Sequence, residues 1–155
     1  MISKKRKIIV TDPEKCVGCG ICELVCSAEK EKAFNPKQGR IRVLRIQPTI
    51  DTAIACRLCE DPPCVKSCPY NALTQYENGI IDINESKCTG CGWCIEACEF
   101  GAITVHPKKK IVICNLCDGD PICVKYCPKD ALDLTTLEIV SIKSRQSRAK
   151  ELCQT

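Results

Sequence analysis

The chain is poor in the residues from which an ordinary hydrophobic core is built. Aromatic residues account for 4% of its 155 residues, with two Phe, three Tyr and one Trp, and there is one Met. His106 is the single histidine, which leaves little material for zinc sites of the Cys-His type or for acid-base catalysis. We therefore expect bound metal to supply much of the folding free energy.

Long apolar runs are missing as well. No stretch approaches the roughly 18 apolar residues of a membrane span. The basic start lacks an Arg-Arg pair, and the apolar run Ile8 to Val10 is too short for the core of a signal peptide. We therefore expect a cytoplasmic protein with no membrane insertion, in a compartment where clustered thiols bind metal.

Cysteine, in contrast, is abundant: there are 17 in the chain. Sixteen of them form four runs of four, and Cys153 is left over as an ordinary free thiol. The runs are Cys16, Cys19, Cys22, Cys26; Cys56, Cys59, Cys64, Cys68; Cys88, Cys91, Cys94, Cys98; and Cys114, Cys117, Cys123, Cys127. The first and third have the C-x2-C-x2-C-x3-C spacing of bacterial ferredoxins, and the others have a longer middle gap. This pattern predicts four 4Fe-4S clusters.

The spacing has a physical reason. Three thiols two residues apart can wrap one loop around a cubane so that each sulfur meets a different iron, while the fourth serves a second cluster. Pro69 and Pro128 follow the fourth thiol of the second and fourth runs. Ser27 and Glu99 stand there in the other two, so the sequence does not fix how those two runs continue.

Disulfides and zinc account for the cysteines less well than iron-sulfur clusters do. A disulfide scaffold is typical of secreted chains, and tetrahedral zinc uses pairs of thiols or thiols with histidine rather than triplets plus one. The formal charge is +4. Four oxidised cubanes of about −2 each add about −8 and leave the loaded protein near −4. The basic residues are therefore interpreted as compensation for cluster charge and not as a nucleic-acid surface.

The remaining sequence suggests short elements between two related halves. Lys15 to Gly20 matches Lys87 to Gly92, and Cys64 to Pro69 matches Cys123 to Pro128. Expected elements are strands at 8–11, 40–47 and 136–142, helices at 27–33 and 144–152, a hairpin of 73–76 with 80–83 around Asn78-Gly79, and a hairpin of 102–105 with 111–113. His106 is expected to be an exposed turn residue of the second hairpin.

No residue set suggests chemistry on an organic substrate. The sequence has no phosphate-binding Gly-rich loop and no nucleophile paired with a base. We therefore expect a non-catalytic electron-transfer protein. A redox sensor is the alternative from another class, but the additional nucleic-acid or nucleotide module that it would need is not visible.

With all four runs in place, the chain resembles the four-cluster iron-sulfur subunits of molybdenum and tungsten oxidoreductases, formate and hydrogenase complexes, and carbon monoxide dehydrogenase. The resemblance covers about Ile8 to Leu134. It implies nested pairing of the runs, first with fourth and second with third. Transferred to this sequence, the iron ligands would form four sets: Cys16, Cys19, Cys22, Cys127; Cys26, Cys114, Cys117, Cys123; Cys56, Cys59, Cys64, Cys98; and Cys68, Cys88, Cys91, Cys94.

The resemblance also implies an α+β fold with two ferredoxin-like dicluster lobes, built from short β-hairpins and short helices. The 155 residues would form a single polyferredoxin domain. Its inner lobe would lie at about 52–106 and its outer lobe at about 8–32 and 107–135, with a C-terminal arm at 136–155. Residues 30–52 and 134–155 exceed what two lobes need and are expected to cover a partner surface.

Two stretches are similar to the small subunits of tungsten-dependent aldehyde oxidoreductases. They are Phe34-Asn35-Pro36-Lys37 followed by Arg40-Ile41, and the stretch from Cys114 to Pro121. The implied partner is a catalytic tungsten or molybdenum pterin enzyme, with a flavin subunit or soluble ferredoxin as a further partner. The alternatives are a freely diffusing polyferredoxin, or a subunit of a carbon monoxide dehydrogenase, hydrogenase or formate dehydrogenase.

Overall fold

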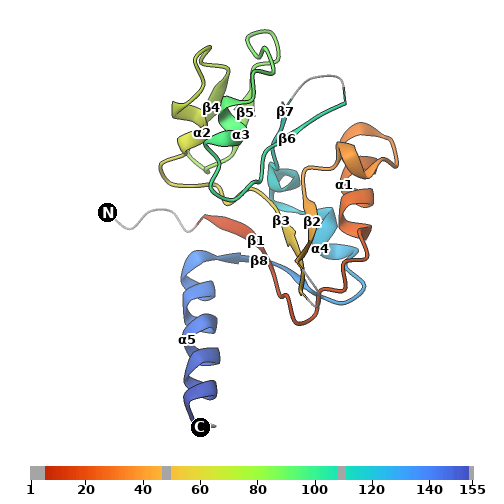
Figure 1. The fold of residues 1–155 in the computed structure, drawn as a ribbon, viewed down its shortest axis with the longest axis vertical. Helices are drawn as coiled ribbons and strands as arrows, with labels where there is room; N and C mark the ends of the chain where they lie inside the picture. Colours follow the sequence, from red (N-terminus) through yellow and green to blue (C-terminus); the bar gives the residue numbers. More distant parts are fainter. Residues whose placement is uncertain (1–5, 47–49, 108–110, 154–155) are drawn as a thin grey trace.

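The computed structural model describes residues 6–46, 50–107 and 111–153. Within these ranges the fold is α+β, as predicted, and its elements are short. The strands form antiparallel pairs, each a two-stranded sheet of its own. Figure 1 shows β4, β5, α2 and α3 grouped in one half of the molecule and β1, β2, β3, β8, α1 and α4 in the other.

The two ends of the cluster-binding region are joined by a pair of strands. Strand β1 (Lys7–Thr11) pairs with β8 (Leu132–Thr136), from Lys7 opposite Thr136 to Thr11 opposite Leu132. The backbone N–H of Asp12 extends the contact by donating to the carbonyl of Ala131 at 2.7 Å. The predicted strand at 8–11 is confirmed, and its pairing brings the first and last cysteine runs together.

The strand predicted at 136–142 is wrong. Thr136, paired with Lys7, is the last residue of β8. The chain turns instead into α5 (Leu137–Cys153), which includes the predicted helix at 144–152. Helix α5 extends away from the rest of the molecule (Figure 1). Its side chains at Leu137, Ile139 and Ile142 are exposed.

The predicted hairpin around Asn78-Gly79 is confirmed. It joins β4 (Leu73–Gln75) to β5 (Ile81–Ile83). The side chain of Asn78 accepts from the N–H of Ile80 at 3.0 Å, and Gly79 has a positive φ of 88° that other residues rarely adopt.

The second predicted hairpin is also present, as β6 (Thr104–Val105) and β7 (Ile111–Val112). Part of its turn, 108–110, lies outside the described residues. The expectation for His106 is wrong, because this side chain is buried. Its Nε2 lies 3.8 Å from Oε2 of Glu31, so the start of the turn packs toward the end of α1 instead of facing water.

Helix α1 (Ile21–Glu31) contains the last two cysteines of the first run, and a third hairpin follows it before the second run. The helix predicted at 27–33 is correct in type, but the observed helix begins earlier, inside the first run. The short 3₁₀ turn η1 (Pro36–Gln38) leads into β2 (Arg42–Ile46), within the predicted strand at 40–47, of which residue 47 is not described. Its partner β3 (Ile50–Ile54) was not predicted.

Short helices mark the other runs. They are α2 (Pro63–Lys66), α3 (Trp93–Glu96) and α4 (Ile122–Lys125), with the 3₁₀ turn η2 (Leu116–Gly119) inside the fourth run. Helix α1 contacts α4, and α2 contacts α3. The first run is thereby placed beside the fourth and the second beside the third.

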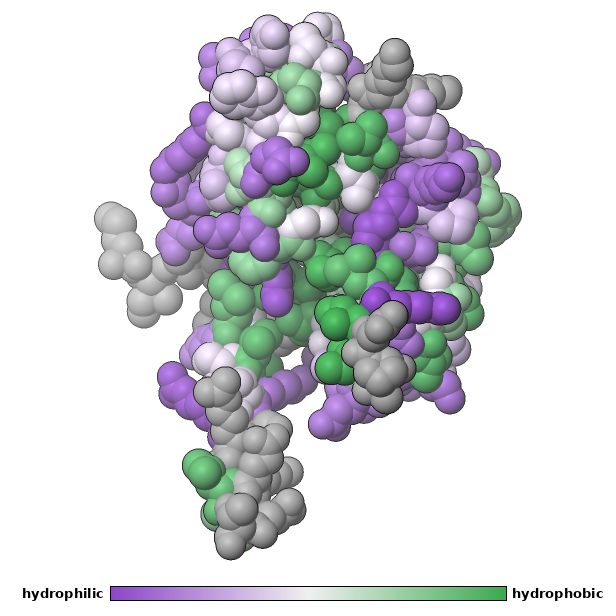
Figure 2. Space-filling model, viewed as in Figure 1, coloured by the Kyte–Doolittle hydropathy of each residue, from purple (hydrophilic) through white to green (hydrophobic). Residues whose placement is uncertain are grey.

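Cysteines form part of the interior. The buried cluster combines aliphatic side chains such as Ile8, Ile41 and Leu58 with thiols of all four runs. Figure 2 shows hydrophobic residues gathered in the middle of one face, with hydrophilic residues around them. Across residues 6–46, 50–107 and 111–153, no helix combines the length and hydrophobicity needed to cross a membrane.

Candidate iron-sulfur cluster sites

The first and third runs begin with the same local structure. Asp12 and Asn84 lie four residues before Cys16 and Cys88, and their carbonyls accept the N–H of those cysteines at 3.0 Å. Their side chains accept further backbone N–H groups, as in Asx turns. Each loop then contains two glycines with positive φ, which lets the backbone curl around the thiols: Gly18 and Gly20, and Gly90 and Gly92.

Gly18 also permits close packing. A Cβ at this position would lie 2.6 Å from Cγ of Asp51 in β3, and its φ of +63° disfavours other residues. Arg45 donates to the carbonyl of Gly18 at 3.1 Å and lies 3.8 Å from Asp51. The β2–β3 hairpin is therefore attached to the first cysteine loop.

The second and fourth runs use proline to widen the middle gap. Pro62 and Pro121 precede α2 and α4 in extended conformation, so the third thiols, Cys64 and Cys123, lie in the first turn of a short helix. Both thiols are buried. The two runs thus present their last two thiols in the same way.

The fourth thiol of each run accepts a backbone N–H. In three runs the donor is an alanine four residues later, at 3.3 to 3.4 Å: Ala72 to Cys68, Ala102 to Cys98 and Ala131 to Cys127. The residue before each alanine has a positive φ, and these residues are Asn71, Gly101 and Asp130. The sequence signal for this turn is an alanine preceded by a residue that tolerates a left-handed backbone. The cysteine spacing alone does not reveal this signal.

The first run ends differently. Helix α1 continues to Glu31, five residues beyond Cys26, and the donor to the Cys26 sulfur is the N–H of Arg40 at 3.2 Å. Ser27 is fully buried; its hydroxyl donates to the carbonyl of Leu24 at 2.8 Å and accepts the N–H of Asn35 at 3.2 Å. Ser27 therefore connects the loop that contains Asn35 to α1 through its hydroxyl. Proline has no hydroxyl and could not make these hydrogen bonds.

Two of the expected ligand sets each line one cavity. Cys16, Cys19, Cys22 and Cys127, the Cys16 set, surround a cavity that Val43 and Ala53 of the β2–β3 hairpin also line. Cys68, Cys88, Cys91 and Cys94, the Cys68 set, surround another, which Tyr70 and Trp93 also line. Both aromatic side chains are more than half exposed, at 51% and 63%.

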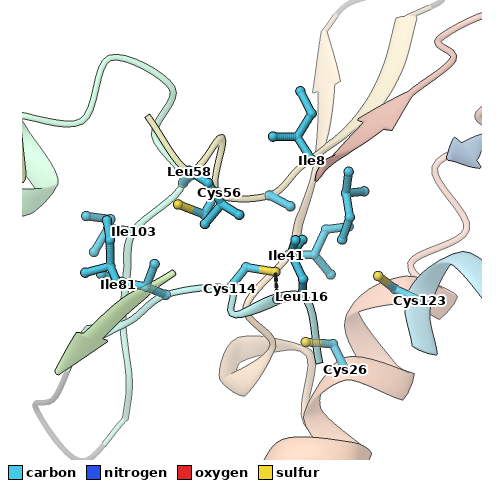
Figure 3. Close-up of a cluster of buried hydrophobic side chains, with 14 of the residues drawn as sticks. Ile8, Cys26, Ile41, Cys56, Leu58, Ile81, Ile103, Cys114, Leu116 and Cys123 are labelled. Atoms are coloured by element: carbon cyan, nitrogen blue, oxygen red, sulfur yellow. Dashed lines mark hydrogen bonds between the residues drawn. The ribbon is translucent and has the colours of Figure 1, made fainter. Parts of the chain in front are cut away.

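The other two sets are grouped as well. Figure 3 shows the sulfurs of Cys26, Cys114 and Cys123 directed toward a common space. Cys117 completes this Cys26 set, because after burial it is among the causes that raise the pKa of all three of these thiols. In the Cys56 set (Cys56, Cys59, Cys64, Cys98), burial first and then Cys98 raise the pKa of Cys64, and Cys59 adds to it. All four groupings follow the nested pairing; their role as ligand sets stays a prediction.

Comparison with known proteins shows the family of this chain. A model described as a 4Fe-4S binding domain matches residues 9–28 and 81–104. The polyferredoxin-like subunit of the aliphatic sulfonate oxidoreductase of Pyrococcus furiosus is 42% identical over 139 residues, covering 86% of this chain and 80% of that protein. The chain belongs to the polyferredoxin-like 4Fe-4S electron-transfer family.

Further relatives of this polyferredoxin carry related descriptions. The thiosulfate reductase electron transfer subunit PhsB of Salmonella typhi is 31% identical over 146 residues, covering 84% of this chain and 76% of that protein. A chain of the active site complex BamBC of benzoyl coenzyme A reductase has a TM-score of 0.50 at 26% identity, covering 96% and 98% of the two chains. The predicted function, electron transfer without a catalytic role of its own, is confirmed.

Several thiols of the polyferredoxin are buried away from water. Burial raises the pKa of Cys22 and Cys56 to about 12 and that of Cys94 and Cys114 to about 11. Without metal these thiols are neutral at pH 7, while iron ligation requires thiolates. Cluster insertion therefore releases protons, and the positive charge of iron replaces them.

The donor sets fit a 4Fe-4S cubane better than a single ion. Each set offers four thiols, and backbone N–H groups point at the sulfurs of Cys26, Cys68, Cys98 and Cys127. In the part of the chain that the structure describes, no three His, Cys, Asp or Glu side chains converge closely enough to hold one metal ion. Zinc draws its sulfur ligands to about 2.3 Å, so these thiols are spaced more widely than zinc requires.

Proposed function

We propose that the four sets each hold one 4Fe-4S cluster, with all sixteen run cysteines as iron ligands. The observation that carries this proposal is the grouping of sixteen thiols, taken from runs far apart in sequence, into four quartets. When bound, each such cluster takes up and releases single electrons. The chain supplies the thiolates, the N–H donors and the exclusion of water.

We propose further that the sets form one conducting row, in the order Cys16, Cys26, Cys56 and Cys68. Each step is supported by a thiol of one set that raises the pKa of a thiol in the adjacent set, with burial as the larger cause in every case. Cys22 affects Cys123, Cys114 affects Cys56, and Cys64 affects Cys94.

The exposed thiols support the two ends of this row. Of the sixteen run cysteines, only Cys19 and Cys91 are exposed. They belong to the first and last sets of the proposed row. Electrons would therefore enter at one of these loops and leave at the other.

The lobes of the proposal follow the same nesting. The inner lobe, about 52–106, contains the Cys56 and Cys68 sets, and the outer lobe, about 8–32 and 107–135, contains the Cys16 and Cys26 sets. Contacts of α2 with α3 and of α1 with α4, together with the β1–β8 pair, support this division. Residues 136–155 form the proposed arm.

The proposed partner is a catalytic oxidoreductase subunit, with a tungsten or molybdenum pterin enzyme favoured by the stretches at 34–41 and 114–121. A flavin subunit or a soluble ferredoxin would be the second redox partner, and the cytoplasm the location. The expectation that 30–52 and 134–155 cover a partner gains support from exposed Phe34, Ile46, Ile50 and Leu137. Phe34 is the most exposed of these side chains, at 81%.

The decisive experiment measures iron, acid-labile sulfide and zinc per chain on anaerobically prepared protein, and tungsten and molybdenum in any co-purifying complex. About sixteen irons and sixteen sulfides per chain are expected for four cubanes. Iron near one cubane, or stoichiometric zinc, would overturn the four-cluster proposal. A metal-loaded chain that purifies from its native cells without a larger subunit would instead favour the freely diffusing carrier.

A further inference from the structure

Helix α5 (Leu137–Cys153) leaves the rest of the molecule soon after it begins. Figure 1 shows it extending outward from the end of β8. Val140 in its first turn is half-buried, whereas Leu137, Ile139 and Ile142 are 61%, 44% and 45% exposed. A single helix of 17 residues is only marginally stable in water, and helices in proteins gain most of their stability by packing against a neighbour. Within the part of the chain that the structure describes, most of α5 lacks such packing.

Exposed residues recur along one face of α5. Ile139, Ile142, Gln146, Ala149 and Cys153 are three or four residues apart, as on the contact face of paired helices, and all five are exposed. The helix is also basic, because its sequence contains four lysines and arginines against two acidic residues. Its surface therefore suits a groove with an apolar floor and a negative charge.

A groove of that kind crosses the same molecule. It has a volume of about 1120 Å³, lies beside the β1–β8 pair and the start of α5, and has buried Ile9, Ala55 and Leu132 in its floor. This volume exceeds the roughly 300 to 1,000 Å³ of small-molecule pockets. Two turns of a helix about 10 Å across occupy roughly 850 Å³, so the groove can hold part of a helix.

The groove carries more negative than positive charge. Five acidic and three basic residues line it. Both of its lysines already pair within the chain, Lys15 with Asp12 at 3.8 Å and Lys143 with Asp133 at 3.2 Å. Among residues 6–46, 50–107 and 111–153, no cation pairs with the other three carboxylates, which are those of Glu14, Glu99 and Asp130. These three carboxylates are therefore available to a basic segment.

The outer part of α5 does not fill the groove of its own chain. Val140, Lys143 and Ser144 line the groove, but the helix then leads away from it (Figure 1). The chain thus contains two complementary surfaces, a basic helix with an exposed apolar stripe and an acidic groove with an apolar floor. Within one molecule they do not meet, but between two molecules they can.

We propose that the outer part of α5 from a second copy of this chain docks in the groove. Its apolar stripe lies on the floor, and its basic residues, such as Arg145, lie beside Glu14, Glu99 and Asp130. The contact closes into a dimer when two chains exchange helices, or continues from chain to chain when they do not. The inference deepens the proposal that residues 134–155 cover a partner, because it names that partner as another copy.

The test is analytical ultracentrifugation of the full, anaerobically prepared chain, with iron and sulfide counted in every sample. Reductant is present so that no disulfide through exposed Cys153 joins two chains. At about 100 μM the chain should sediment as a dimer or a larger assembly. Added salt should weaken this assembly, because it screens the charges of the helix and the groove.

An exchange of charges identifies the two surfaces. The groove variant combines Glu14→Lys with Glu99→Lys, and the helix variant combines Arg145→Glu with Gln146→Glu. Each alone should raise the Kd of self-association at least about tenfold. An equimolar mixture of the two should assemble again, because the altered groove then meets the altered helix and the unaltered groove meets the unaltered helix.

A matched control changes the same net charge outside the groove. Glu29→Lys with Glu96→Lys reverses two exposed carboxylates of α1 and α3 that do not line the groove, and should leave self-association unchanged. Ile142→Ser changes one exposed apolar side chain of α5 and should raise the Kd about tenfold. Because Ile142 is remote in sequence from all four cysteine runs, this variant decides the proposal even if the groove variant loses iron.

The outcomes separate this inference from the four-cluster proposal. With about sixteen irons per chain, an unmodified chain that is monomeric at about 100 μM would overturn the docking of α5. So would groove and helix variants that assemble as well as the control, or a mixture of the two that stays monomeric. An unmodified chain that binds far less iron would instead overturn the four-cluster proposal, whatever its state of association.

Discussion

Proline after the fourth thiol should be tolerated in the third run and damaging in the first. Pro69 and Pro128 already follow Cys68 and Cys127, and Glu99 and Ser27 stand at the equivalent positions. From the cysteine pattern alone, Ser27→Pro and Glu99→Pro are the same change. The structure predicts opposite results.

The difference lies in where each helix ends. Helix α3 ends at Glu96, so Glu99 is in an exposed turn with the same local form as the turns at Pro69 and Pro128. Helix α1, in contrast, runs to Glu31 and holds Ser27 in its interior. Proline there removes a helical hydrogen bond and clashes with the carbonyl of Glu23, at a cost of about 3 kcal/mol or more.

The lost hydroxyl adds to this cost. Ser27 is fully buried, and its hydroxyl makes two hydrogen bonds, to the carbonyl of Leu24 and from the N–H of Asn35. The N–H of Asn35 keeps its bond to the carbonyl of Ala33, so the cost is that of two lost hydrogen bonds, about 1 to 3 kcal/mol in total. The two effects together come to about 4 to 6 kcal/mol, a large part of the total stability of a small domain. Glu99→Pro should stay within about 1 kcal/mol of the unmodified chain.

The assay is guanidinium unfolding under anaerobic conditions, followed by far-UV circular dichroism and cluster absorbance, with iron counted before unfolding. Ser27→Pro should lose iron and unfold at much lower denaturant than Glu99→Pro. Ser27→Ala provides a graded control, because it removes only the hydroxyl and should cost about 1 to 3 kcal/mol. Equal stability and iron content in the two proline variants would refute the reasoning.

Three other changes have defined outcomes. Asn71 has a φ of 47°, so Asn71→Val should destabilise the loaded protein by about 1 to 2 kcal/mol while Asn71→Gly, which copies Gly101, should not; equal midpoints in denaturant would contradict this. Cys153 is exposed at the end of α5, so Cys153→Ser should leave iron per chain unchanged, and any loss of a cluster would make it a ligand. Removal of iron by an anaerobic chelator should abolish most circular dichroism, because the interior is built around the thiols; a native-like spectrum without iron would show that the aliphatic core suffices.

Much of the local structure was predictable because its causes are local. Asn78-Gly79 fixes a hairpin through one side-chain hydrogen bond and one positive φ, and both predicted hairpins are present. The strand at 8–11 was also identified correctly, although its partner β8 was not. That partner lies more than a hundred residues away, and no short-range pattern specifies it.

One of the errors has a tertiary cause. His106 follows a hairpin strand and precedes Pro107, a setting typical of an exposed turn, yet packing beside Glu31 of α1 buries it. For His106 a distant element determined the conformation. The apolar residues of 136–142 suit a strand, but β8 ends at Thr136 and Leu137 begins α5.

The sequence by itself determined the chemistry of this protein: four runs of thiols at cubane spacing, the glycines and prolines that let each loop curl, and the absence of catalytic motifs. These depend on residues within a few positions of one another. Only the tertiary structure decided which runs meet, why Ser27 replaces proline, and that Arg40 donates to Cys26 across 14 residues of chain. Such contacts depend on how α1, β2 and the fourth cysteine loop pack together, and the free energy of that packing is not encoded in any one segment.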